Sequence, residues 1–148
     1  SLSREDSFTP QYQSFSSLKL SCLSSLKTLA LRCNNLSYLG ASFSELIGLK
    51  FADFSNNKIV SIHEEAFESN FEELKELLMN NNQLIALPNS IGNFLEYASI
   101  IKMFVNDCNR LTKLHLNNNS LVQLPESIGN LKNLTFLNLR VRFSSIIR

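Results

Sequence analysis

The stretch 111–121 reads LTKLHLNNNSL. Its leucines alternate, as the inward-facing residues of a short strand do, and an asparagine follows where the chain must turn. The pattern L-x-x-L-x-L-x-x-N-x-L, with conservative replacements, also starts at residues 26, 49 and 74. A fifth copy opens at residue 134 with three leucines in register and then departs, because Arg142 stands where the asparagine is expected. The starts are 23, 25, 37 and 23 residues apart, which indicates a repeat architecture.

The second half of the unit repeats as well. Residues 87–94 read LPNSIGNF, and residues 124–131 read LPESIGNL. Pro88 and Pro125 lack the N–H that a strand ladder needs, so we expect regular pairing to stop there. Short 3₁₀ or irregular segments are then predicted on the outer side of each unit, with the aliphatic residues of the motif turned inward.

A single strand of this kind cannot bury its leucine-rich face alone. Stacked copies make a parallel sheet and a continuous apolar core. The turn after each strand leaves backbone N–H and C=O groups outside the sheet, and a side-chain amide has both a donor and an acceptor to satisfy them. We therefore expect an internal asparagine ladder. Its predicted members are Asn34, Asn57, Asn82 and Asn119.

These copies resemble the leucine-rich repeat family, and the resemblance covers roughly residues 18–140. It implies an α/β fold: a right-handed solenoid, a fragment of a curved horseshoe, with a parallel sheet on the concave face and short helical or 3₁₀ segments on the convex face. The domain is expected to span residues 15–148, after a polar tail or cap remnant at residues 1–14. The L-P-x-S-I-G-N-L copies are most similar to intracellular members associated with small-GTPase signalling, and to plant and protist scaffolds.

The interval of 37 residues marks an insertion at about residues 95–110. Its apolar and polar residues segregate at helical spacing, which predicts an amphipathic helix of about four turns on the outer side of the solenoid. Three interpretations stay open. The segment is a tolerated loop insertion, a helix that docks a partner or a neighbouring domain, or a degenerate repeat copy that starts near Tyr97.

The residues between the inward leucines form three rows on the predicted concave face. They mix apolar, acidic, basic and amide side chains, which suits a protein partner better than a phosphate backbone. The apolar members Phe51, Leu78 and Phe136 are expected to be exposed without a packing role, although packing along the sheet is an equally good interpretation for Phe51. The candidate protein-binding residues are Arg32, Phe51, Asp53, Glu76, Leu78, Lys113, His115, Phe136, Asn138 and Arg140.

Composition argues against most other classes of function. The 148 residues include fourteen basic and thirteen acidic ones, so no field of one sign is available for nucleic acid or a membrane. The spacing of the three cysteines fits neither a disulfide framework nor a metal site. Cys22 and Cys108 are predicted to be small core residues, and Cys33 to lie near the concave edge. His63 and His115 are expected on opposite faces, so we expect no catalytic site, no metal and no cofactor.

These observations favour a non-enzymatic protein–protein interaction module, a cytoplasmic scaffold or adaptor in intracellular signalling that binds through the concave face. The resemblance implies a protein partner, such as a small GTPase or a signalling enzyme, rather than nucleic acid or a membrane. One alternative is a regulatory arm of a multidomain signalling enzyme, such as a kinase, cyclase or phosphatase. The other is an extracellular recognition domain, which a signal peptide and cap cysteines would indicate.

Overall fold

The computed structural model describes residues 20–68, 71, 73–92 and 111–140. The predicted polar tail at residues 1–14, the predicted insertion helix at residues 95–110 and the part of the fifth copy beyond residue 140 lie outside the described residues.

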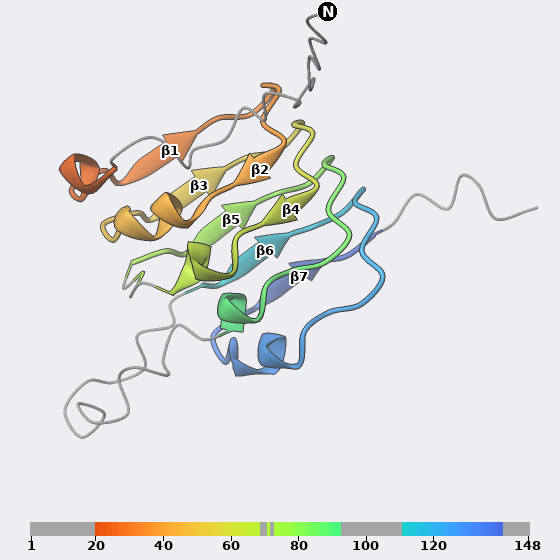
Figure 1. The fold of residues 1–148 in the computed structure, drawn as a ribbon. Helices are drawn as coiled ribbons and strands as arrows, with labels where there is room; N and C mark the ends of the chain where they lie inside the picture. The colour runs from red at the N-terminus through yellow and green to blue at the C-terminus, as the bar shows by residue number, and fades with distance from the viewer. Residues whose placement is uncertain (1–19, 69–70, 72, 93–110, 141–148) are drawn as a thin grey trace, which may run out of the picture.

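Five short parallel strands form the main sheet, one from each copy of the repeat (Figure 1). In their order across the sheet they are β1 (Thr28–Ala30), β3 (Phe51–Asp53), β5 (Glu76–Leu78), β6 (Lys113–His115) and β7 (Phe136–Asn138). The register pairs equivalent positions of successive copies, so that Leu77 lies beside Leu114. Each copy is therefore one coil of a solenoid, and we number the coils one to five by these strands. The α/β solenoid predicted from the repeat is confirmed.

The outer side of the stack consists of 3₁₀ segments and one small sheet (Figure 1). The 3₁₀ segments are η2 (Ser21–Leu23), η3 (Ala41–Glu45), η4 (Glu64–Phe67), η5 (Asn89–Gly92) and η7 (Glu126–Asn130). In the small sheet, β2 (Tyr38–Leu39) pairs with β4 (Ser61–Ile62). The N–H of His63 continues this pairing by donating to the carbonyl oxygen of Leu39 at 2.8 Å. The equivalent residue of coil three is Pro88, which has no N–H, so the small sheet ends at β4.

The core lies between the main sheet and the outer segments. Inward side chains of the strands, such as Leu77 and Leu114, are fully buried, and each such side chain contributes roughly 1.5–3 kcal/mol. Coils one and two lack the L-P-x-S-I-G-N motif and fill the same space with aromatic rings. The ring of Phe43 packs against Phe54, Phe67 and Phe71 at centroid distances of 5.4, 5.7 and 5.1 Å.

An inner asparagine ladder connects the turns that follow the strands. The side-chain nitrogen of Asn82 donates to Phe54 O of coil two at 3.0 Å and to Met79 O of its own coil at 3.1 Å. Its side-chain oxygen accepts from the N–H of Ile59 at 3.0 Å. Asn57 and Asn119 repeat this geometry, and all three are 6 to 8% exposed. These amides replace water for backbone groups that the turns leave unpaired.

Asn34 occupies the same position in coil one but is exposed. Its side-chain nitrogen donates only within its own turn, to Leu31 O at 2.9 Å and Arg32 O at 3.2 Å. The other ladder members bond to the coil that precedes them, and no described strand precedes β1. Asn34 therefore makes the hydrogen bonds within its own turn, but it makes none to a preceding coil among the described residues.

A second, outer asparagine ladder runs beside the first. Asn56, Asn81 and Asn118 have positive φ angles of 55° to 56°, a region that asparagine tolerates better than most residues. The side-chain nitrogen of Asn81 donates to Asn56 Oδ1 at 2.9 Å, and that of Asn118 donates to Asn81 Oδ1 at 2.6 Å. Cys33 holds the equivalent place in coil one at φ 59° and is exposed. The outer ladder therefore stops at Asn56, because a thiol stands where the next amide belongs.

Replacing Cys33 by Asn is expected to stabilise the protein by about 1 kcal/mol. Asparagine adopts the left-handed conformation at lower cost, and its side-chain oxygen can accept a hydrogen bond from the amide of Asn56. The midpoint of urea unfolding measures the gain. Cys33→Ser is the control, because it removes the thiol without adding an amide. An equal gain in both variants would attribute the effect to loss of the thiol and not to the ladder.

Candidate functional site

The outward side chains of the main sheet make one continuous surface, which we call the sheet face. The strand register places them in three rows that run across all five coils, with the alternation that side chains of a strand must have. The first row is Thr28, Phe51, Glu76, Lys113 and Phe136; the second is Ala30, Asp53, Leu78, His115 and Asn138; the third is Arg32, Ser55, Asn80, Asn117 and Arg140. The sequence-predicted binding residues are thus brought together on one face.

Exposure differs strongly among these predicted residues. Phe136 is 44% exposed, whereas Phe51 and Leu78 are half-buried. Asp53 is only 6% exposed, and its side-chain oxygen accepts from the N–H of Ser55 at 2.9 Å and from the hydroxyl of the same residue. The expectation that Asp53 offers a carboxylate to a partner is therefore wrong, because that carboxylate already serves the backbone of its own coil.

Glu76 organises the first and second rows. Its carboxylate lies 3.3 Å from the Lys113 ammonium and 3.8 Å from Nε2 of His115. The imidazole of His115 in turn lies against Phe136, with ring centroids 4.8 Å apart and an interplanar angle of 33°. The expectation that Phe136 has no packing role is therefore corrected: one side of its ring rests on a neighbouring strand and the rest faces solvent.

Lysines line the edge of the sheet where the strands begin. Lys27 and Lys50 lie 3.1 and 3.0 Å from the two carboxylate oxygens of Glu73. Hydrogen bonds from Lys50 and Lys27 hold the pKa of Glu73 below its ordinary value. These ion pairs are exposed, so they add little to the stability of the protein. They do neutralise the positive charge of two of the lysines at this edge.

Charge is divided between the two sides of the described structure. The sheet segments (26–32, 49–55, 73–80, 111–117 and 134–140) carry six basic and three acidic side chains, whereas the other described segments carry two basic and five acidic ones. All three acidic side chains on the sheet side have partners. Asp53 accepts a hydrogen bond from Ser55, and Glu73 and Glu76 form ion pairs with lysines. The basic side chains left on that side without an acidic partner among the described residues are Arg32, Lys75 and Arg140.

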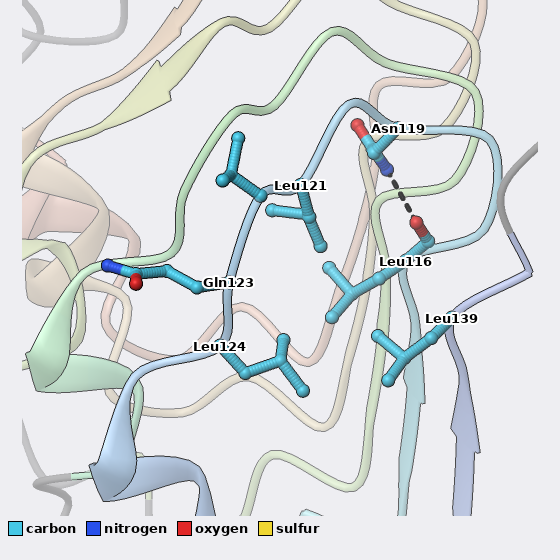
Figure 2. Close-up of a pocket in the computed structure, with 7 residues that line it drawn as sticks. Leu116, Asn119, Leu121, Gln123, Leu124 and Leu139 are labelled. Atoms are coloured by element: carbon cyan, nitrogen blue, oxygen red, sulfur yellow. Dashed lines mark hydrogen bonds between the residues drawn. The ribbon is translucent and has the colours of Figure 1, made fainter. Parts of the chain in front are cut away.

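A cavity of about 160 Å³ lies between coil four and the strand of coil five. Leu116, Leu121, Leu124 and Leu139 turn toward it, and Gln123 points away (Figure 2). Asn119 also lines the cavity, but its side-chain nitrogen already donates to Leu116 O at 2.8 Å. The cavity is lined mainly by inward leucines of the kind that fill the core between other coils, so it is a gap in packing. Its described lining offers no free polar group that could orient a ligand.

Other predicted features fall as follows. Cys22 is exposed, so its expected place in the core is wrong, and Cys108 lies outside the described residues. His115 belongs to the sheet face, whereas Nδ1 of His63 accepts from the N–H of Glu65 and caps η4 on the outer side.

Within the described ranges, no group of three or more His, Cys, Asp or Glu side chains could hold a metal ion. No described helix is long and apolar enough to cross a membrane.

Comparison with known proteins agrees with the repeat. Residues 110–131 match the family model described as Leucine Rich Repeat. Among solved structures, the chain is similar to the leucine-rich repeat protein LIC12759 of Leptospira interrogans, with a TM-score of 0.55 and 27% sequence identity. The match covers 82% of this chain and 33% of that protein, so the chain spans about a third of the length of its structural relative. No curated protein matches the sequence significantly.

Proposed function

Because the chain belongs to the leucine-rich repeat family, we propose that it binds a protein partner through its sheet face. Domains of this family are typically non-enzymatic interaction modules. The observation that carries the proposal is the sheet face itself. Five coils present side chains of mixed polarity on it, and hydrogen bonds between neighbouring strands hold the backbone of each coil in place. Phe136 leaves 44% of its surface to solvent on this face, and an exposed aromatic ring is a common centre of a protein interface.

The finer part of the proposal is a scaffold or adaptor that works in the cytoplasm, in intracellular signalling, with a small GTPase or a signalling enzyme as partner. The resemblance of the two L-P-x-S-I-G-N-L copies to intracellular members of the family supports it. Asn118 offers a test of the location, because it begins an N-x-S sequon, and such sequons are glycosylated in secreted proteins. A glycan found on Asn118 of the native protein would contradict a cytoplasmic location.

Replacing Phe136 by Ser is expected to weaken partner binding about tenfold, because the variant loses an exposed aromatic anchor of the sheet face. The melting temperature should stay within a few degrees, since the ring is almost half exposed. Immobilised protein incubated with native lysate, followed by quantitative mass spectrometry of the captured proteins, measures the change.

Val122→Ser is the matched control for this experiment. Val122 is 86% exposed, it is also apolar, and it lies outside the sheet face. A genuine partner should be depleted by Phe136→Ser and retained by Val122→Ser. If every captured protein responds alike to the two variants, the sheet face is not the binding surface and the proposal fails.

A further inference from the structure

The third row of the sheet face differs from the other two in its charge. Arg32 and Arg140 stand at its two ends, and Ser55, Asn80 and Asn117 lie between them. No carboxylate belongs to this row, and neither arginine has an ion-pair partner among the described residues. Both arginines are exposed. Two guanidinium groups are therefore available, on backbone positions whose separation the sheet fixes, with neutral polar side chains in the space between.

The separation of the two arginines follows from the sheet. Their strands, β1 and β7, are four strand spacings apart in the order β1-β3-β5-β6-β7. At about 4.8 Å per spacing, the two backbone positions lie roughly 19 Å apart. An extended peptide advances about 3.3 Å per residue, so roughly six residues cover this distance.

The amides between the arginines favour a peptide over a phosphate backbone. Asn80 and Asn117 are half-buried, and their side-chain amides make no hydrogen bond within the described part of the chain. Each amide carries both donors and an acceptor, which match the C=O and N–H of a peptide group. A phosphodiester backbone has acceptors only, so it would leave the amide oxygens unused.

Arginine selects carboxylates in particular. Its planar guanidinium can donate two parallel hydrogen bonds to one carboxylate, a geometry that a lysine ammonium lacks. The lysines of the same face are largely occupied, since Glu73 binds Lys27 and Lys50 while Glu76 binds Lys113. The free positive charge of the row thus lies at its two ends.

From these observations we propose that the third row binds an extended acidic segment of a protein partner. The segment runs across the coils, and two of its carboxylates, about six residues apart, bind Arg32 and Arg140. Its peptide groups between them hydrogen-bond to Asn80 and Asn117. The inference rests on the proposed function of the sheet face and narrows the partner to a chain with spaced acidic residues.

The test uses capped peptides of seven residues made of serine and glycine. The probe has an aspartate at each end, one control peptide has its two aspartates adjacent at the centre, and another has a lysine at each end. Titration into the full chain is followed by the backbone amide signals of the protein in NMR spectra. The probe should shift the signals of the third row and bind at least fivefold more tightly than either control peptide.

Protein variants complete the test. Arg32→Glu with Arg140→Glu should weaken binding of the probe at least tenfold. Lys58→Glu with Lys132→Glu changes the net charge equally, outside the sheet segments, and should alter it less than twofold. Thermal unfolding verifies that both double variants are folded.

Four results would overturn the inference: no shift at millimolar probe, equal binding of the spaced and central peptides, equal losses in the two double variants, or tighter binding of an oligothymidylate than of the probe. Failure of the proposed function itself is recognised separately. A partner that is lost with Phe136→Ser but kept with the arginine variant would leave the sheet face as the binding surface and refute only the acidic segment.

Discussion

Gly92→Ala is expected to destabilise the protein by about 3 kcal/mol or more, whereas Gly129→Ala should leave its stability nearly unchanged. A Cβ atom added to Gly92 would overlap with the backbone carbonyl of Ser127 in the next coil. Backbone cannot move aside as a flexible side chain can, so coils three and four would have to separate. A Cβ atom added to Gly129 meets no atom of the described residues within 4 Å.

The pair makes a controlled comparison because both glycines belong to the same S-I-G-N motif, and neither has a positive φ angle. The expected difference is therefore steric and does not come from the conformational freedom of glycine. Urea unfolding of the two single variants beside the parent protein measures it. Equal losses in the two variants would mean that coils three and four do not pack as described. Total stabilities of domains are about 5–15 kcal/mol, so Gly92→Ala should also lower the melting temperature clearly.

The second large effect is expected for Asn82→Ala, which should cost about 3 kcal/mol. The substitution removes the side chain that accepts from the N–H of Ile59 and donates to Phe54 O and Met79 O. These groups are buried, and each one left without a partner costs about 1–3 kcal/mol. The loss should be accompanied by faster hydrogen exchange at the N–H of Ile59, since that group would have lost its acceptor.

Asn34→Ala is the control for the ladder, because it removes the same side chain from an exposed position. Its two hydrogen bonds lie within its own turn, and solvent can replace them. We expect a loss below about 1 kcal/mol. Similar losses at Asn34 and Asn82, or an unchanged exchange rate at Ile59, would contradict the role of the ladder in joining the coils.

The strand register could be predicted from the sequence because the repeat itself encodes it. The alternating leucines of each copy define which side chains face inward, and copies in phase can only stack with equivalent positions side by side. The observed pairing of Leu77 with Leu114 follows from this rule. The pairing limit at Pro88 follows from the missing N–H of proline. Both features depend on local chemistry that recurs from coil to coil.

The outward positions of the sheet face were predicted correctly, but the burial of Asp53 and the packing of Phe136 were not. Asp53 occupies an outward position, yet its carboxylate bonds to Ser55 and is covered by its neighbours. Phe136 also occupies an outward position, yet His115 covers one side of its ring. The period of a strand states the direction of a side chain, whereas exposure depends on which residue the adjacent coil places beside it.

The outer ladder was missed although a signal for it exists. Adjacent asparagines recur at residues 56–57, 81–82 and 118–119, and the first member of each pair has the left-handed conformation. Cys33 interrupts the pattern in coil one, so the recurrence is visible only in three coils. Nothing in the sequence states that the first amides bond to one another, because those bonds join residues 25 and 37 positions apart.

The sequence by itself determined the solenoid, the register of its strands and the inner ladder, because each arises from a short pattern that every coil repeats. The tertiary structure alone decided what each coil meets in its neighbour. Gly92 and Gly129 have the same motif around them, but only Gly92 touches the backbone of a further coil in the described structure. In the same way, the stacking of coils brings Glu73 and Glu76 within reach of lysines of other coils. Both carboxylates are therefore paired with lysines, and the two arginines of the third row have no acidic partner among the described residues.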